Sequence, residues 1–443
     1  MNNEDIYVSL DIGTSAVKVI IGEMSGKSLQ VIGVGTAPSR GMKRGAIVDI
    51  DETVHSIREA IQKAERMVGL SITRVILGVN GNHIEMKPCS GVVAVSSSDR
   101  EIRDEDIDRV MDAAQVLSIP PEREIVDTIP TQFIVDGLEG ITDPRGMMGV
   151  RLEVEATLIT GAKTTLHNLL RCVERAGLEI EALCLQPLAA GDFALSKDEK
   201  TLGVAMVDIG GGSTTISVFK DGMMQALRVL SIGGDHITND ISVGLRTTSE
   251  EAERIKRHHG YAFIDDASED VTFSMNTMGN DHSEDYSQYE IAQIIEPRLE
   301  EIFELVHEEI YRMGYSDLPG GYIFTGGSVM IPGTLDLAED VLRQNVRMTV
   351  PDYIGVREPI YTTAIGLIEF AHEHVKIQDK EMAVTSSSEE QSFQAAPLPP
   401  ADAKPKKDRK ELREQREKEN QSNQSDQPTV KSKVKNFFKV FFE

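Results

Sequence analysis

Two short segments of this sequence combine an aspartate, glycines and hydroxyl residues in the same order. In the first, Asp11-Ile12-Gly13 is followed by Thr14 and Ser15, and Lys18 lies on the next apolar run. In the second, Asp208-Ile209-Gly210 is followed by Gly211, Gly212, Ser213, Thr214 and Thr215. A tight turn of small residues exposes consecutive backbone N–H groups, which bind anions such as phosphate. Either segment alone fits an ordinary glycine turn between strands, but the repeat favours a pair of phosphate-binding hairpins.

The acidic members of these segments, Asp11 and Asp208, suggest a metal ion. A carboxylate cannot contact phosphate favourably, so we expect both side chains to hold Mg²⁺ through water. Mg²⁺ usually keeps several waters and takes only one or two carboxylates. The second aspartate comes 197 residues after the first. This separation predicts two related halves of the chain that close on one nucleotide.

A third glycine-containing segment is Phe324-Thr325-Gly326-Gly327-Ser328, which follows an apolar run. Paired glycines at such a place let the backbone lie against a flat base, or against a phosphate at a helix N-terminus. A plain strand-to-helix turn would explain the segment equally well by itself. Its position after two phosphate hairpins favours a ligand-binding role, so we expect Gly326, Gly327 and Ser328 at the same site.

The apolar patterns around these segments predict an α/β fold in which strands present each turn. Strands are expected over Ile6–Leu10 and Val17–Gly22, and the same strand–turn–strand pattern restarts at Val204. Helical periodicity covers Glu52–Val68, with Gly69 as a C-cap, and Ile291–Met313. Other expected elements are a helix over Asp104–Leu117 with Asp104 as N-cap, strands at Gly91–Val95, Gln132–Val135 and Val154–Ile159, and an exposed hairpin or loop over 265–288.

The composition argues against nucleic-acid binding and against secretion. The net charge is −26, so the body of the protein is not expected to bind nucleic acid. Cys89, Cys172 and Cys184 show no metal-ligand spacing and fit reduced thiols. The acidic residues 1–5 lack the apolar region of a signal peptide, and no apolar run reaches the ~18 residues of a spanning helix. We therefore expect a protein that stays inside the cell.

The last part of the sequence differs in kind from the rest. Residues 376–443 carry a net charge of +2, which leaves −28 on the first 375 residues. Residues 380–430 have too little apolar content to fold alone and are predicted to be a disordered linker. In 431–443, one helical face would carry Val434, Phe437, Phe438 and Phe441, with Phe442 at its edge, and the other Lys435 and Lys439. Aromatics opposite lysines favour a helix that lies on an anionic membrane surface. A helix that docks on protein is the alternative.

The order of the three glycine segments resembles the actin, heat-shock chaperone and sugar kinase superfamily. The resemblance implies an actin-like two-domain ATPase fold that binds ATP with Mg²⁺. By the same resemblance, Cys184–Gly191 matches the first connecting segment, where Gln186 would lie near the attacking water, with Asp11 and Asp208 as its catalytic partners. Ala364–Gly366 matches the second connecting segment. In 252–256, Glu253 and Lys256 would reach the ribose, although without the superfamily they would simply form a solvated helix face.

A narrower resemblance rests on Asp11–Lys18, on Arg40–Asp49, on the interruption at 84–162 and on the basic amphipathic end. Together these segments are similar to the FtsA family of bacterial cell-division proteins. The resemblance implies actin-like filaments of the protein itself and a tether between the membrane and the C-terminal segment of the ring protein FtsZ. It also implies other division proteins as partners, and a peripheral location on the cytoplasmic face of the membrane at the division site.

The family architecture predicts how the sequence is divided. The expected parts are a first-half core (1–83 and 163–190), an inserted subdomain (84–162), a second-half core (191–229 and 311–350), an outer subdomain (230–310), a terminal helix on the first half (351–379), the linker (380–430) and the membrane-binding helix (431–443). FtsZ would bind the outer subdomain. The sequence leaves open whether ATP is hydrolysed at a useful rate, so the chain is at most a weak ATPase. A pilus-assembly adaptor and a small-molecule kinase of the same fold are the alternatives.

Overall fold

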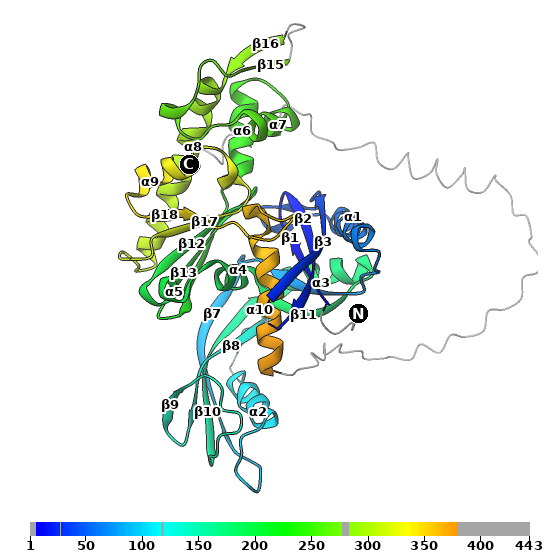
Figure 1. Ribbon diagram of the computed structural model, residues 1–443, viewed down its shortest axis with the longest axis vertical. Coiled ribbons are helices and arrows are strands. Elements are labelled where there is room, and N and C mark those ends of the chain that lie inside the picture. Colours follow the sequence, from blue (N-terminus) through cyan, green and yellow to red (C-terminus); the bar gives the residue numbers. More distant parts are fainter. Residues whose placement is uncertain (1–5, 27, 117–118, 277–282, 379–443) are drawn as a thin grey trace, which may run out of the picture. The chain divides into compact units, whose positions relative to one another are not determined.

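The structure is a computed structural model that describes residues 6–26, 28–116, 119–276 and 283–378 (Figure 1). The predicted linker, 380–430, and the predicted membrane-binding helix, 431–443, lie outside the described residues. Two five-stranded sheets and one four-stranded sheet carry the fold of the described part. The α/β class that the sequence predicts is therefore confirmed.

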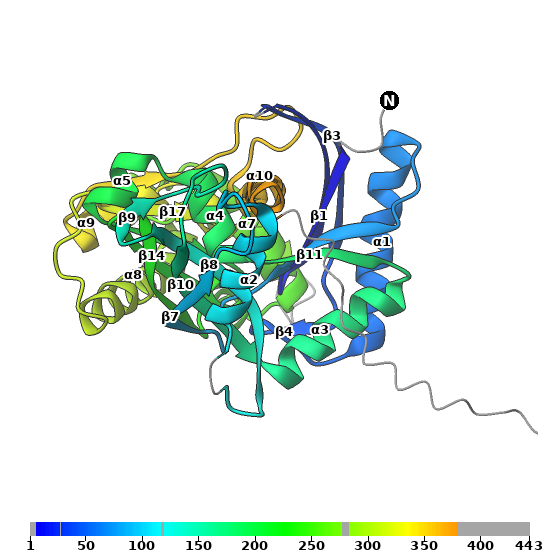
Figure 2. The same ribbon diagram turned by 90° about the horizontal axis from the view of Figure 1, so that it is seen from below.

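The first half is built on a five-stranded mixed sheet whose spatial order is β11 (Glu179–Leu185), β6 (Arg74–Val79), β1 (Ile6–Ile12), β2 (Ala16–Ser25) and β3 (Ser28–Pro38). β1 runs antiparallel to β2 and parallel to β6. Both faces of the sheet are covered, as Figure 2 shows. Leu10 and Val19 pack toward α1 (Ile50–Val68) and α3 (Lys163–Ala176), whereas Ile20 and Ile76 pack toward α10 (Thr362–Gln378).

Helix α1 illustrates how local sequence sets the element boundaries. Asp49 caps its start, because the Asp49 carboxylate accepts a hydrogen bond from the backbone N–H of Glu52 at 3.0 Å. Gly69 ends it with a φ of +75°, as the sequence predicts for a C-cap glycine. The apolar stripe between these caps, Val54, Ile57, Ile61 and Ala64, is buried against the sheet.

The second half repeats the arrangement of the first. Its sheet has the order β14 (Met223–Leu230), β13 (Thr214–Lys220), β12 (Val204–Ile209), β17 (Tyr322–Thr325) and β18 (Val346–Met348). β12 is antiparallel to β13 and parallel to β17, as β1 is to β2 and β6. Each half therefore presents one strand–turn–strand hairpin beside a parallel strand. Covering one face are α8 (Gln288–Arg312) and α9 (Thr334–Leu342).

The inserted subdomain is a four-stranded sheet in the order β7 (Glu85–Ala94), β10 (Arg151–Ala162), β8 (Arg123–Val135) and β9 (Leu138–Ile141). Helix α2 (Asp104–Ala114) packs on it around the buried side chains of Val110, Phe133 and Leu152. The predicted cap of this helix is wrong by one position. Arg103 is the N-cap residue, and Asp106 accepts a hydrogen bond from the Arg103 N–H at 3.2 Å. The helix also ends at Ala114, before the predicted Leu117.

The outer part of the second half consists of α6 (Gly234–Gly244), α7 (Ser249–His259) and the hairpin of β15 (Thr272–Asn276) and β16 (Ser283–Ser287). The hairpin falls inside the stretch predicted to be an exposed hairpin or loop. Ile237 of α6, Ile255 of α7 and Ile295 of α8 share one buried cluster with the second sheet. This cluster fixes α7 beside the turn of β12 and β13.

Two connecting helices lie at the base between the halves, α4 (Gln186–Ala194) and α10, and α5 (Lys197–Leu202) follows α4. They cross at Gly366, where a Cβ atom would lie 2.4 Å from the carbonyl oxygen of Ala189. On α4, a Cβ at Gly191 would lie 2.1 Å from the ring of Phe219 on β13. Small residues at both crossings let α4 start directly under the hairpins, with Gln186 as its first residue.

Candidate functional site

A cavity of about 430 Å³ lies between the two hairpins. Its walls come from the turn of β1 and β2, the turn of β12 and β13, helix α7, and the glycine segment after β17. The structure brings together sixteen of the residues that the sequence nominates for catalysis, metal or cofactor binding. They are Asp11, Gly13, Thr14, Ser15, Lys18, Gln186, Asp208, Gly210, Gly211, Ser213, Thr215, Glu253, Lys256, Gly326, Gly327 and Ser328.

Two nominated residues, Gly212 and Thr214, do not line this cavity. Thr214 is fully buried, and its hydroxyl donates a hydrogen bond to the carbonyl of Ile232 at 2.8 Å. Because successive side chains of a strand point to opposite faces, Thr215 faces the cavity and Thr214 faces away from it. Gly212 lies against Thr14 of the other hairpin, where a Cβ atom would come within 2.7 Å of the Thr14 methyl group.

The two turns are closed by equivalent backbone hydrogen bonds. The N–H of Gly13 donates to the carbonyl of Ala16 at 3.0 Å, and the N–H of Gly210 donates to the carbonyl of Ser213 at 3.0 Å. Asp11 is paired with Lys18 across the first hairpin, and Asp208 is paired with Thr215 across the second. The two hairpins that the sequence suggests are duplicates therefore share the same strand pairing and the same turn hydrogen bond.

Asp11 lies at the centre of the first wall. One of its carboxylate oxygens accepts a hydrogen bond from Lys18 Nζ at 2.7 Å, and the other accepts one from Gln186 Nε2 at 2.8 Å. Burial alone would lower the pKa of Lys18, but the charges of Asp11 and Asp208 and the hydrogen bond to Asp11 raise it overall. Lys18 is therefore a fixed positive charge directed into the cavity, and α4 contributes Gln186 to the same cluster.

Asp208 differs from its counterpart in the first half. Burial and the negative charge of Asp11 raise the pKa of Asp208, Lys18 lowers it, and the result is a pKa of about 6. Gly326 adopts a φ of +95° beside it, and a Cβ there would lie 2.3 Å from a carboxylate oxygen of Asp208. Ser328 of the same segment donates to the carbonyl of Gly210 at 3.1 Å. The third glycine segment is thereby fastened to the second hairpin.

Gly211 of the second hairpin lies close against Ser15 of the first hairpin. A Cβ at Gly211 would lie 1.9 Å from the hydroxyl oxygen of Ser15 and 3.3 Å from the Ser15 Cβ, so a side chain at this position requires Ser15 to move. The same Cβ would lie 2.9 Å from a carboxylate oxygen of Asp235. Glycine is required here by space rather than by backbone conformation.

Helix α7 brings Glu253, Lys256 and Arg257 to the cavity. Lys256 is 7 % exposed, and its Nζ lies 2.6 Å from Glu253, 3.0 Å from the carbonyl of Gly234 and 2.8 Å from the hydroxyl of Thr238. Burial would raise the pKa of Glu253, but Lys256 and further hydrogen bonds lower it overall. Lys256 therefore holds the Glu253 carboxylate ionised and in place at the edge of the cavity.

Sequence reasoning missed several lining residues, among them Thr36, Gly45, Asn80, Arg257, Glu358, Ile360 and Thr363. A usable signal existed for Asn80. It follows β6, which runs parallel to β1, and the carboxyl ends of parallel strands meet at one edge of a sheet. Arg257 follows Lys256 directly, and its guanidinium bonds Glu253 at 2.6 Å. The residues near Ile360 come from a distant loop that only the tertiary fold brings to the site.

The fold is shared with solved structures of actin-like proteins. The chain resembles the "PilM-PilN type IV pilus biogenesis complex" with a TM-score of 0.56 and 17% identity, covering 82% of this chain and 97% of that one. It resembles MreB5 of Spiroplasma citri with a TM-score of 0.52 and 14% identity, covering 84% and 97%. The fold is therefore actin-like, as the sequence predicts.

Sequence comparison narrows this class to one family. The family model for "Cell division protein FtsA" matches residues 205–366, and that for the "SHS2 domain inserted in FTSA" matches residues 81–160. The cell division protein FtsA of Bacillus subtilis is 60% identical over 382 residues, 86% of this chain and 87% of that protein. The FtsA of Escherichia coli is 33% identical over 384 residues, covering 83% and 90%. The chain belongs to the FtsA family of cell-division proteins, which confirms the predicted family and its inserted subdomain.

Within the ranges that the structure describes, no helix combines the length and the apolar character needed to cross a membrane.

Proposed function

We propose that this member of the FtsA family binds Mg-ATP in the cavity between its two hairpins. The observation that carries the proposal is the pairing of two equivalent turns, each with an aspartate at its base and backbone N–H groups at its tip. Gly211 and Gly326 leave room that a side chain would fill, which fits close approach of a nucleotide. The MreB5 structure, which shares the fold, is bound to AMPPNP and supports the same class of ligand.

The residues of the cavity have complementary proposed roles. Thr14, Ser15 and the turn N–H groups of both hairpins would hold the phosphates, and Lys18 would neutralise their charge. Asp208 would bind the Mg²⁺ ion through water, together with Asp11. When bound, Mg²⁺ neutralises charge on the terminal phosphates. Gln186, which Asp11 fixes at the start of α4, would position a water molecule for attack, so the residues permit hydrolysis without setting its rate.

At the base end of the cavity, Gly326, Gly327 and Ser328 would lie against the adenine or the α-phosphate. Glu253 would accept hydrogen bonds from the ribose hydroxyls, since Lys256 holds its carboxylate ionised beside the cavity. Lys256 itself has three acceptors within the protein, so we assign it a supporting position behind Glu253.

We propose further that the protein polymerises on the cytoplasmic face of the membrane and anchors the FtsZ ring there. Family membership and the actin-like fold support self-association, with the inserted subdomain on one side of the contact. The FtsZ C-terminal segment would bind the outer subdomain, about 230–310. The amphipathic pattern of 431–443 supports a peripheral membrane anchor, and family membership favours this role over those of a pilus-assembly adaptor and a small-molecule kinase.

Titration calorimetry with Mg-ATP tests the cavity. Gly211→Val and Gly326→Val should abolish binding, because each new side chain occupies space that the opposite hairpin or Asp208 needs. Asp208→Ala should weaken binding of Mg-ATP more than binding of metal-free ATP. Gly69→Asn is the matched control, since Asn tolerates the left-handed backbone at this helix end far from the cavity. Normal Mg-ATP affinity in both Gly→Val variants would exclude the cavity as the nucleotide site.

A further inference from the structure

One short hairpin connects the cavity with the inserted subdomain. It consists of β4 (Met42–Lys43) and β5 (Ala46–Ile47), and Gly45 lies in its turn with a φ of +73°. The N–H of Gly45 donates to the hydroxyl oxygen of Thr14 at 3.0 Å. The carbonyl of the same residue accepts a hydrogen bond from Asn80 Nδ2 at 2.7 Å. A single residue thus joins the phosphate-binding turn of β1 and β2 to Asn80.

Asn80 lies where the chain leaves the first-half sheet for the inserted subdomain. It directly follows β6, and the first strand of the insert, β7, begins five residues later at Glu85. The Asn80 side-chain oxygen accepts a hydrogen bond from the N–H of Asn82 at 3.1 Å, which fixes the connecting segment. The Asn80 amide therefore makes two hydrogen bonds. Its nitrogen bonds Gly45 beside the cavity, and its oxygen bonds Asn82 on the segment that leads to the insert.

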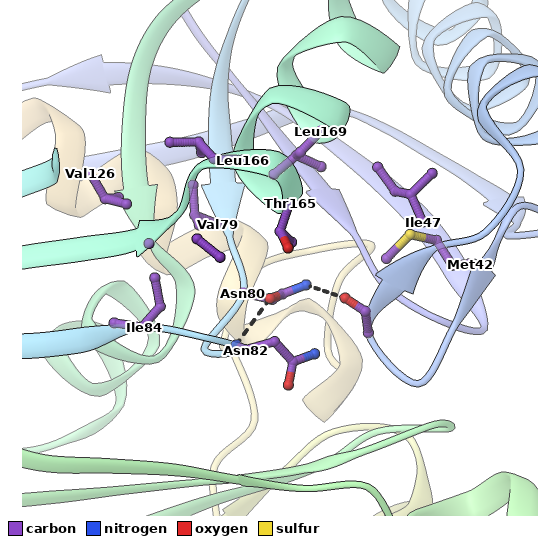
Figure 3. Close-up of a pocket in the computed structure, with 13 residues that line it drawn as sticks. Met42, Ile47, Val79, Asn80, Asn82, Ile84, Val126, Thr165, Leu166 and Leu169 are labelled. Atoms are coloured by element: carbon purple, nitrogen blue, oxygen red, sulfur yellow. Dashed lines mark hydrogen bonds between the residues drawn. The ribbon is translucent and has the colours of Figure 1, made fainter. Parts of the chain in front are cut away.

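Beside Asn80, a largely apolar pocket of about 20 Å³ lies where the first-half core meets the base of the insert (Figure 3). Its lining comes from the β4–β5 hairpin, the end of β6, helix α3 and the two segments that enter and leave the insert, with the side chains of Met42, Ile47, Val79, Ile84, Val126 and Leu169. Gly45 and Asn80 line both this pocket and the nucleotide cavity, whereas Asn82 lines the apolar pocket. Most of the side chains that line this junction are apolar, and its hydrogen bonds to the β4–β5 hairpin include those that Asn80 and Asn82 donate.

Arg123 links the two segments of the chain that enter and leave the insert. Its guanidinium donates to the carbonyl of His83 on the entering segment at 3.0 Å and to the carbonyl of Thr160 on the leaving strand at 2.7 Å. It also lies 3.0 Å from Glu85. Because one side chain joins both crossings of the chain, a displacement of the segment after Asn80 moves the whole base of the insert.

We propose that Asn80 is a positioning residue which couples occupancy of the nucleotide cavity to the orientation of the inserted subdomain, through Gly45 and Thr14. The inference rests on the proposed nucleotide binding. A Thr14 hydroxyl that donates to a phosphate becomes a better acceptor for the Gly45 N–H, because successive hydrogen bonds polarise one another. Gly45 is then drawn toward the first hairpin, and Asn80 follows it and moves the entry to β7.

Distance measurement between two spin labels on the full-length chain tests the coupling. Gln62→Cys places one label on the exposed face of α1, and Glu105→Cys places the other on the exposed face of α2 in the insert. The three native cysteines are buried and do not compete for the label. The distance distribution is recorded without nucleotide and at saturation with Mg-AMPPNP, in the absence of lipid, after calorimetry has fixed the saturating concentration for each variant.

We expect saturation to shift the distance in the labelled parent. Asn80→Ala and the nearly isosteric Thr14→Val should each lose at least half of this shift when each is measured at its own saturating concentration. The affinity of Thr14→Val for Mg-AMPPNP should fall, because Thr14 is a proposed phosphate contact. If the Asn80 variant fails to fold, Thr14→Val still tests the coupling, because it removes the hydroxyl that accepts the hydrogen bond from Gly45. Asn82→Ala is the matched control, and it should retain the shift, since it leaves the Gly45–Asn80 bond in place.

Two results would overturn the inference while the proposed nucleotide binding stands. One is a labelled parent that binds Mg-AMPPNP without any change in distance. The other is a shift of equal size in the parent, Asn80→Ala and Thr14→Val. A parent that fails to bind Mg-AMPPNP in calorimetry removes the proposed function itself, before any distance is measured.

Discussion

The two hairpin aspartates occupy equivalent positions but have different surroundings. Asp11 accepts hydrogen bonds from Lys18 and Gln186, so its negative charge is compensated within the protein. Asp208 faces Thr215 across its hairpin, and burial raises its pKa to about 6. A divalent cation lowers the energy of an ionised, buried carboxylate, so we expect Asp208 to dominate the affinity for Mg²⁺ and Asp11 to orient Lys18 and Gln186.

Asp106 in the inserted subdomain provides a pH-dependent test at the scale of one residue. The side chain is 2 % exposed; burial raises the pKa of its carboxyl, but hydrogen bonds from Arg109, Arg103 and Ser96 lower it below its usual value. A depressed folded-state pKa adds stability above the unfolded-state value of about 4, and this stability is lost as the pH falls through the folded-state pKa. Asp106→Asn should therefore cost about 1–3 kcal/mol at pH 7 and less at pH 3.

Chemical denaturation of the full chain at pH 7 and pH 3 measures this difference. Glu174→Gln, on the exposed surface of α3, is the control and should change the free energy of unfolding little at either pH. An equal loss of stability at both pH values in Asp106→Asn would mean that the charge of Asp106 is unimportant.

At the residue scale, the sequence predicts which residue types form the site better than it predicts which of their side chains point into the cavity. The repeated Asp-Ile-Gly is local, so it identifies both hairpins without knowledge of the fold. Thr214 was nominated with Thr215 although strand alternation places only one of them in the cavity. Glu358 and Thr363 were missed because no local pattern marks them, and only the packing of a distant loop and of α10 brings them to the site.

At the element scale, the prediction succeeds where the apolar pattern is regular. Helix α1 has a clear stripe and two caps, and its predicted end agrees with the structure. The sequence predicts strand β8 only over Gln132–Val135, but the strand begins at Arg123. Its first part contains Pro130 and two register shifts against β10, which break the two-residue alternation that identifies a strand. For α2, acidic residues fit either the cap or the first turn, so the predicted cap, Asp104, falls one residue after the actual N-cap, Arg103.

The proposed membrane helix, 431–443, carries the next prediction. Flotation with anionic vesicles should recover the full-length chain, and Phe438→Glu with Phe441→Glu should abolish it, because each carboxylate lies where the helix must enter apolar lipid. Lys435→Gln with Lys439→Gln should weaken binding to anionic vesicles more than to neutral ones. The isolated 13-residue segment should gain helical circular dichroism only on vesicles, since so short a helix is unstable in water.

Ser387→Glu with Ser388→Glu is the control for the membrane helix. It adds the same two charges in the predicted linker and should leave flotation unchanged. A chain that lacks 431–443 and still floats with vesicles would exclude the anchor. If the deletion instead lowers the melting temperature of the body, the segment docks on protein.

For the whole molecule, the inserted subdomain can be separated from nucleotide binding. β7 and β10 are antiparallel neighbours, and Glu85 lies opposite Thr160, so the ends left by removing 84–162 are adjacent. A short Gly-Ser linker can therefore close the gap. The shortened chain should bind Mg-ATP within about tenfold of the full chain, because both hairpins and Gln186 remain, but it should form no filaments on a lipid monolayer.

Electron microscopy of the monolayer and calorimetry together check the deletion. Filaments with an unchanged repeat would show that the insert is not part of the contact. Loss of Mg-ATP binding would show that the site depends on the insert. The charge of the molecule also affects the monolayer assay. The first 375 residues carry a net charge of −28 and are repelled by an anionic leaflet, so we expect the basic segment 431–443 to make the attachment.

The two glycine crossings of α4 have a consequence for kinetics. Gly366 brings α10 against the backbone of Ala189, and Gly191 brings the ring of Phe219 against the same helix. Such close packing resists displacement on either side, so we expect the cleft to open at the rim, where Gly211 meets Ser15. If nucleotide binds as proposed, we expect its residence time to be set by separation of the rim. Nucleotide exchange would then limit turnover, and a partner that wedges the rim apart would act as an exchange factor.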